Sequence, residues 1–324
     1  MGSNKEEGSL MKSRSTQSCI LEGYRLYLFN FRKIFKSAWL PAVFYALCFS
    51  AITTMAVIHY PRLNVRVEID PSIFMASLPT YRLILIVTIV ASILSLFANS
   101  YILAALFRLL RGHSTLGVVE IPSRWFWFDR HVIWRVMKGF FAVMLLWVVV
   151  GGIAGGLGIS IEILVNKLAG RQLIPDGLFM WPLLIVVILF LLPTYFSMYK
   201  YILQPNHRFW PSLWTTYREG LRHWGMVFSA WFIANIVILL VSLVVLLPSN
   251  ILSLANFQAN IGMLYGDPLG MPSYILPFTI IIMLIAGFVE SFIQLTLHTI
   301  LYYVYGSIET RELERRNYKK KLDI

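Results

Sequence analysis

The residues with the clearest potential for chemistry lie in the last long apolar stretch of the chain. Glu290, Gln294 and His298 recur at intervals of four residues, so a helix stacks them along one face. A carboxylate near the middle of a membrane costs about 2.5–3.5 kcal/mol on insertion scales and usually faces a cavity or a partner. Three interpretations fit: a proton- or substrate-binding carboxylate with His298 as a relay, a hydrogen-bonded staple between helices, or a shorter span that leaves Glu290 in water.

Polar residues in other apolar stretches lie at a comparable depth. They are Asn99, Ser100, Thr194 and Asn235. At about 1.5 Å per helical residue, each falls about ten residues or fewer from the basic end of its stretch. We therefore expect a polar layer in the inner third of a helical bundle. This layer lines a vestibule if the helices leave a gap, and forms a buried hydrogen-bond network if they do not.

Glycines gather in the third apolar stretch, at Gly151, Gly152, Gly155, Gly156 and Gly158. Their spacing gives overlapping GxxxG patterns, which let helix backbones approach closely. The pattern predicts helix packing within a subunit or between subunits. A flexible point at which the helix bends is the alternative.

Membrane-spanning helices are needed to position all these residues. A spanning helix takes about 20 predominantly apolar residues. The chain contains six such stretches, at residues 39–58, 83–107, 139–161, 178–203, 226–247 and 274–303. Charged residues make up only 14% of the chain, against about 25% in soluble domains. The expected fold class is all-α and polytopic, with six transmembrane helices paired as three helical hairpins.

The distribution of positive charge predicts the orientation. Of the 28 Lys and Arg residues, 23 lie in the two tails and in the segments after the second and fourth spans. The others are Arg62, Arg66, Arg82, Lys167 and Arg171. Because basic loops stay on the cytoplasmic side, both termini are expected there. The net charge of +12 is spread between the spans, which favours anionic membrane lipids, and not nucleic acid, as partners.

Basic, aromatic-rich stretches precede the first, third and fifth spans, at residues 24–38, 125–137 and 214–224. Amphipathic helices of this kind lie in the plane of the cytoplasmic interface. The recurrence fits three homologous units of helix plus hairpin, or it reflects the shared physics of an interface. The tryptophans clustered there fit an aromatic belt or a surface that recognises lipid headgroups.

The expected domain organisation is a disordered cytoplasmic tail at residues 1–20, a membrane domain at 21–305 and a charged cytoplasmic tail at 306–324. Residues 1–16 are polar and charged, which argues against a secretory signal peptide.

Motifs of familiar enzyme classes are missing from the sequence, which has no HExxH, GxSxG, P-loop or Rossmann glycine pattern. Cys19 and Cys48 lack metal-binding spacing, and Asp129, His131 and His207 lack a second carboxylate cluster. We therefore predict no catalytic residue, no metal site and no cofactor.

The last span closes in Leu301-Tyr302-Tyr303-Val304-Tyr305, followed by Glu309-Thr310-Arg311-Glu312. With the three hairpins and their basic aromatic helices, this ending resembles a broad bacterial group of membrane proteins. The group includes the membrane domain attached to some glycerophosphodiester phosphodiesterases. The resemblance implies a six-helix module of the bacterial cytoplasmic membrane that often stands alone without a catalytic partner, and it implies no reaction.

Two functions follow as expectations. In the first, the bundle interior handles a small solute, a proton or a lipid, which predicts a hydrated cavity touching Glu290. In the second, the protein is a noncatalytic scaffold or assembly factor that organises lipids or a partner protein, as a homo-oligomer or with an unknown membrane partner. The second predicts an enclosed Glu290 and an apolar groove outside the bundle. A membrane-embedded enzyme comes third.

Overall fold

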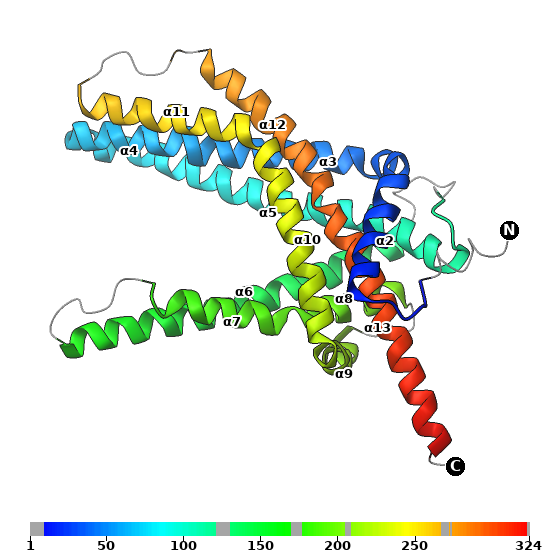
Figure 1. The fold of residues 1–324 in the computed structure, drawn as a ribbon. Coiled ribbons are helices and arrows are strands. Elements are labelled where there is room, and N and C mark those ends of the chain that lie inside the picture. Colours follow the sequence, from blue (N-terminus) through cyan, green and yellow to red (C-terminus); the bar gives the residue numbers. More distant parts are fainter. Residues whose placement is uncertain are drawn as a thin grey trace. The chain divides into compact units, whose positions relative to one another are not determined.

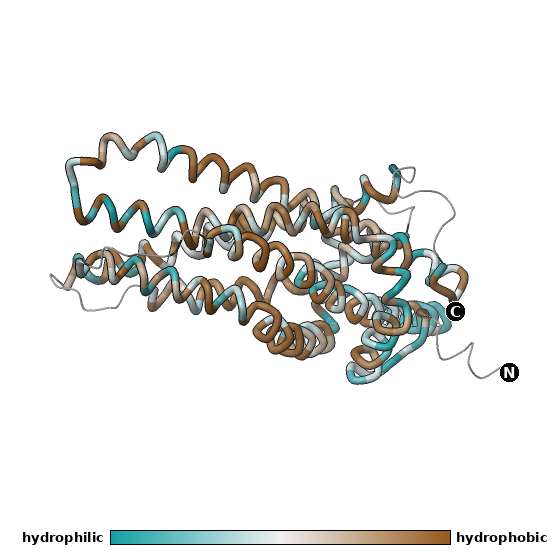
Figure 2. The backbone as a smooth tube through the Cα atoms, turned by 90° about the horizontal axis from the view of Figure 1, so that it is seen from above, coloured by the Kyte–Doolittle hydropathy of each residue, from teal (hydrophilic) through white to brown (hydrophobic). Residues whose placement is uncertain are grey.

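The computed structural model describes residues 10–120, 130–169, 177–204, 209–266, 272 and 274–322. Within these ranges the regular structure is helical, without a strand. Six helical stretches are long and apolar enough to cross a membrane (Figure 1). They are Phe31–Ile69, Pro71–Leu116, Arg130–Ala169, Met180–Leu203, Trp224–Val245 and Ile275–Lys321. Apolar residues cover most of their length (Figure 2). The all-α, six-span prediction is confirmed.

The chain divides into two compact units. Unit 1 comprises Met1–Phe29, Phe107–Ala234 and His298–Ile324, and unit 2 comprises Asn30–Leu106 and Asn235–Leu297. Three boundaries fall inside the helices α5 (Phe74–Leu116), α10 (Trp224–Val245) and α13 (Leu295–Leu322). These helices therefore contribute residues to both units.

Unit 2 is built around the pairing of the first and last spans. Besides the three shared helices, it contains α3 (Phe31–Thr54), the π-helix η1 (Met55–His59), α4 (Tyr60–Ile69), the 3-10 helix η2 (Pro71–Ile73), α11 (Leu247–Leu264) and α12 (Ile275–Ile293). The α3 and α12 helices meet closely at Gly287, where a Cβ atom would lie 2.6 Å from Cδ1 of Phe49. Ser50 Oγ on α3 also donates a hydrogen bond to the Ile280 carbonyl on α12 at 3.0 Å.

The helix α11 lies between the fifth and sixth spans, where the sequence pattern predicts no helix. It has 18 residues and no charged side chain, but its Asn, Ser and Gln residues lower its hydropathy below that of a spanning helix. It packs against α4, η1 and α12 (Figure 1). Its buried polar positions, Ser249, Asn256 and Asn260, face these neighbours.

Unit 1 contains a long hairpin and three shorter helices. They are α6 (Arg130–Ala169) and α7 (Met180–Leu191) in the hairpin, and α2 (Thr16–Phe29), α8 (Pro193–Leu203) and α9 (Phe209–Arg222). Glu162 on α6 closes the hairpin, because its carboxylate accepts from the backbone nitrogens of Gly177, Phe179 and Met180 at 2.7–3.2 Å. A carboxylate there satisfies the free N–H groups at the start of α7.

The helix α13 forms the core of unit 1, and the N-terminal residues pack on it. A Cβ atom on Gly23 would lie 2.5 Å from Cα of Ile300, so α2 and α13 touch backbone to backbone. The backbone nitrogen of Arg14 donates to Ser307 Oγ at 2.9 Å. Two segments far apart in the sequence thus lie side by side, and these contacts hold residues 10–29 on the last helix.

Helices α2 and α13 run across the two ends of the predicted membrane domain. Residues 10–20 were expected in a disordered tail but pack on α13 and are helical from Thr16 onward; residues 1–9 lie outside the described ranges. The charged tail expected from residue 306 begins as part of the core, because Ser307, Ile308 and Glu309 are buried in the continuous helix α13.

The three stretches predicted to form interfacial helices adopt different structures. Residues 214–224 mostly form α9, which ends at Arg222 and is separate from α10. Residues 24–38 do not form one helix, because Asn30 leaves helical geometry between α2 and α3. Residues 130–137 form the start of α6, and residues 125–129 lie outside the described ranges.

Candidate functional site

Glu290 lies on the buried face of α12, and only one oxygen of its carboxylate is hydrogen-bonded. Oε1 accepts from Ser242 Oγ at 2.9 Å and from Gln294 Nε2 at 3.2 Å. Oε2 is buried and has no hydrogen-bond partner among the described residues. The residue as a whole is 7% exposed. A buried unsatisfied polar atom costs about 1–3 kcal/mol, so the carboxylate of Glu290 is only partly satisfied by its neighbours.

One of the polar residues predicted to accompany Glu290 contacts it, namely Gln294. The second partner, Ser242 on α10, was missed, because a serine in an otherwise apolar helix carries no spacing signal. Asn99 on α5 and Asn235 on α10 are half-buried. Ser242 and Gln294 thus form the polar contacts that the structure describes for the Glu290 carboxylate.

His298 and Thr194 make their contacts in unit 1. Nδ1 of His298 lies 3.0 Å from the Tyr199 hydroxyl, which is also 3.0 Å from the His298 carbonyl oxygen. Thr194 Oγ1 accepts a hydrogen bond from Trp147 Nε1 at 3.1 Å. Both side chains thus join helices of unit 1. The relay from Glu290 to His298 stays a prediction.

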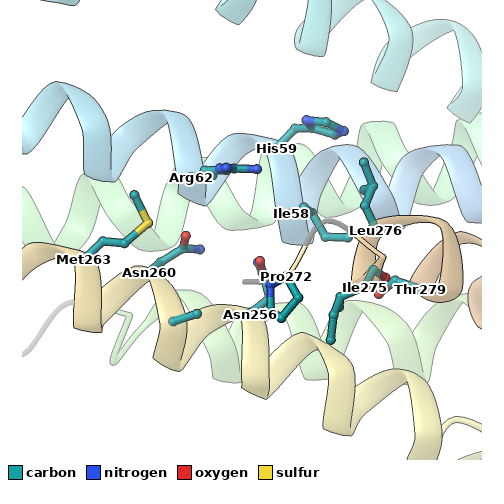
Figure 3. Close-up of a pocket in the computed structure, with 11 residues that line it drawn as sticks. Ile58, His59, Arg62, Asn256, Asn260, Met263, Pro272, Ile275, Leu276 and Thr279 are labelled. Carbon is teal, nitrogen blue, oxygen red and sulfur yellow. Dashed lines mark hydrogen bonds between the residues drawn. The ribbon is translucent and has the colours of Figure 1, made fainter. Parts of the chain in front are cut away.

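A cavity of about 230 Å³ opens in unit 2 between η1, α4, α11 and α12 (Figure 3). Its polar lining comprises His59, Arg62, Asn256, Asn260 and Thr279, and apolar side chains complete the wall. Arg62 is exposed, whereas Asn256, Asn260 and Thr279 are buried. The cavity therefore combines one exposed cation with buried neutral groups that form hydrogen bonds.

The π-helix η1 forms part of this cavity, and π-turns inside helices occur frequently at functional sites. The Val57 carbonyl in η1 accepts a hydrogen bond from Asn256 Nδ2 at 2.6 Å. Asn260 lies one turn further along α11 and projects toward Arg62 of α4 (Figure 3). Its Nδ2 is buried without a hydrogen-bond partner in the described part of the chain. Asn260 thus lines the cavity and carries an unused donor.

The cavity and Glu290 share one face of α12. Thr279 in the cavity lining and Glu290 are eleven residues apart, which corresponds to about three turns and about 16 Å. Met283 and Gly287 lie between them on the same buried face. The lining reaches Thr279 and does not include Glu290. Met283 and Gly287 of α12 thus separate the polar cavity from the buried carboxylate of Glu290.

The predicted packing glycines differ in their surroundings. A Cβ atom on Gly155 would lie 3.8 Å from Cδ2 of Leu184, an ordinary contact within the α6–α7 hairpin. Cβ atoms on Gly151, Gly152 or Gly156 would have no described atom within 4 Å. For these three glycines, packing between subunits stays a prediction. The tightest contact of this group is at the neighbouring Gly158, where a Cβ atom would lie 2.5 Å from Cα of Met180.

A buried lysine joins three helices of unit 1. Lys200 on α8 is 4% exposed, and its Nζ lies 3.0 Å from Oε2 of Glu219 on α9 and 2.9 Å from Oε2 of Glu309 on α13. Glu219 also pairs with Arg316 of α13. This cluster is not visible in the sequence, because ion pairs between distant segments leave no regular spacing. Asp129 and His207, weighed above as metal ligands, lie outside the described residues.

No protein-family model, curated protein or solved structure matches the chain. The resemblance to the bacterial group of membrane proteins therefore stays a prediction.

Proposed function

We propose that this multi-pass membrane protein handles a small polar solute, with the cavity of unit 2 as the solute site and Glu290 as a proton-binding group. The alignment of the cavity and Glu290 along one face of α12 carries the proposal. Membrane transport proteins commonly place an ionisable residue inside the bundle, where it takes up and releases a proton. Helix α12 couples the two sites because both lie on its buried face.

The chemistry of the cavity indicates what it accepts. Arg62 supplies positive charge, and the amides of Asn256 and Asn260 supply donors and acceptors. The unused Asn260 donor favours a solute with an acceptor oxygen, such as a carbonyl or carboxylate. A volume of about 230 Å³ limits the solute to a small metabolite. The preferred class is a small organic anion or a neutral polar compound.

The orientation and location belong to the same proposal. The concentration of Lys and Arg in the tails and in two connecting segments supports cytoplasmic termini. The cavity then opens on the side opposite the termini, because Arg62 lies in α4 at the far end of the first span, Phe31–Ile69. The resemblance of the chain supports a bacterial cytoplasmic membrane, with anionic lipids as neighbours.

The Glu290→Gln variant tests the role of the carboxylate, since it keeps the side chain's shape but removes the titratable group. In proteoliposomes with an entrapped pH dye and an imposed membrane potential, we expect wild-type protein to move protons. Glu290→Gln should reduce this movement to that of protein-free vesicles. The matched control is Glu68→Gln, which removes an exposed carboxylate from α4 of the same unit and should leave the rate unchanged.

A rate for Glu290→Gln equal to that of the wild type would exclude the proton-binding role. So would a wild-type rate equal to that of empty vesicles. The second candidate function, a noncatalytic scaffold, is favoured by the two hydrogen bonds on Oε1. In a scaffold, Glu290→Gln lowers thermal stability and leaves proton movement at the wild-type level, so one variant distinguishes the two functions.

A further inference from the structure

A second polar groove lies in unit 1, between α9 and α13. It is open to the surroundings and has a volume of about 380 Å³. The α9 side contributes Arg218, Glu219 and Arg222, and the α13 side contributes Glu312, Arg315, Arg316 and Lys319. On each helix these positions repeat at three- and four-residue spacing, so each forms one stripe along its helix. Two charged stripes therefore face each other across the groove.

The groove carries an excess of positive charge. Its lining has five cations and two carboxylates. Glu312 accepts from Arg222 Nη1 at 3.0 Å and lies 4.0 Å from Arg315 Nη1, and Glu219 pairs with Arg316. Arg218 and Lys319 are exposed and form no ion pair with a described residue. Two cations are thus left to bind an anion.

The two carboxylates of the groove, Glu219 and Glu312, also contact side chains outside the groove lining. Glu219 Oε2 lies 3.0 Å from the buried Lys200, and Glu312 Oε1 lies 3.1 Å from His223 Nε2. These contacts fix the carboxylates, which in turn hold Arg222 and Arg316 in position. Arginines held in place lose less conformational entropy when they bind a ligand, and their planar guanidinium groups suit phosphate oxygens.

We propose that this groove binds a phosphoryl group, supplied by the headgroup of an anionic phospholipid or by a soluble phosphate ester. A lipid is the favoured source, because Trp210 and Trp214 are exposed on α9, the helix that forms one side of the groove. Trp214 and Arg218 are four residues apart and lie on the same side of the helix. Exposed tryptophans next to arginines are typical of helices at the level of lipid headgroups. This site is independent of the cavity and Glu290.

Titration of the full-length protein in neutral detergent with short-chain phosphatidylglycerol, followed by native mass spectrometry, tests the proposal. The Arg218→Gln/Lys319→Gln double variant removes the two unpaired cations. The Lys320→Gln/Lys321→Gln double variant removes the same charge from α13 outside the groove lining. Each cation near a membrane surface gives about a fivefold gain in binding, so we expect the groove variant to bind about thirtyfold more weakly. The control should bind like the wild type.

Competition by inorganic phosphate distinguishes the two sources. Phosphatidylglycerol binding that resists inorganic phosphate supports a lipid headgroup site, and binding that phosphate displaces supports a soluble phosphate ester. Both results support a phosphoryl site. Equal weakening in the two double variants, or no saturable binding to the wild type, would overturn it. Unchanged thermal unfolding of both variants ensures that lost binding reflects the site.

Discussion

Three side chains of unit 2 have a buried polar atom without a hydrogen bond among the described residues. They are Oγ1 of Thr54, Oε2 of Glu290 and Nδ2 of Asn260. Each such atom costs about 1–3 kcal/mol of stability. Residues that lower stability in this way are expected where a binding role compensates for the cost. Glu290 and Asn260 belong to the helices that surround the proposed solute path, α12 and α11.

Cys19 on α2 gives a prediction that depends on pH. Burial raises the pKa of its thiol from 9.0 to about 11, and the positive charge of Arg14 opposes the shift only in part. In a Cys48→Ala background, we expect Cys19 of the folded protein to resist alkylation by iodoacetamide at pH 9, where an exposed thiol reacts. Mass spectrometry measures the modified fraction, with denatured protein as the control.

The same shift has a consequence for stability. Because the pKa is raised in the folded state, the unfolded state releases the thiol proton first as the pH rises. The free energy of unfolding therefore falls as the pH rises from about 9 to about 11, and Cys19→Ala removes this part of the loss. Alkylation of folded protein as fast as denatured protein would contradict the buried position of Cys19.

The sequence predicted part of the site at this scale. Spacing within one helix brought Gln294 to Glu290, because four residues make about one turn. It could not identify Ser242 or Asn260, since their neighbours lie on other helices. A serine or asparagine inside an apolar helix is a common residue, and only the packing of the helices shows what it contacts.

At the scale of elements, Gly158 gives the sharpest prediction. A Cβ atom there would lie 2.5 Å from Cα of Met180, so α6 and α7 touch backbone to backbone. We expect Gly158→Ala to force the hairpin apart and to lower the free energy of unfolding by about 1–3 kcal/mol. Thermal unfolding in detergent measures the change.

Gly152 on the same helix provides the control. A Cβ atom on Gly152 would have no described atom within 4 Å. Alanine favours a helix by about 1 kcal/mol relative to glycine, so Gly152→Ala should keep or raise stability. Equal destabilisation by both variants would mean that the contact at Gly158 does not hold the hairpin together.

Helix boundaries were less predictable than helix existence. Hydropathy located all six spans, because a run of apolar residues is visible in the sequence. It missed α11, whose polar side chains face other helices. The amphipathic pattern of residues 24–38 also predicted one helix where the structure has α2 and α3. The pattern continues through Asn30, whose backbone leaves helical geometry. Tertiary contacts decide such points, and a periodic pattern does not contain them.

At the scale of the molecule, labelling at position 260 tests on which side of the membrane the cavity opens. In a background without Cys19 and Cys48, we expect Asn260→Cys to react with a membrane-impermeant thiosulfonate added to the side opposite the termini. Ile251→Cys is the matched control, because Ile251 is an exposed apolar residue of α11 and lies nine residues away, on the opposite face. It should stay unmodified in the lipid.

Modification of Asn260→Cys only from the side of the termini would reverse the proposed orientation. Protection from both sides would exclude a water-filled cavity. The sequence predicts orientation from the distribution of Lys and Arg, and it predicts the number of spans from hydropathy. It does not predict the two units, because three of their four boundaries fall inside continuous helices.

The packing of residues 10–29 on α13 also sets the order in which the protein is made. Arg14 bonds to Ser307, a residue that the ribosome adds 293 positions later. During synthesis, residues 10–29 therefore have no contact with α13 until that helix has been translated. Unit 1 can close only after translation of α13, so the segment that is made first depends for its partner on one that is made much later.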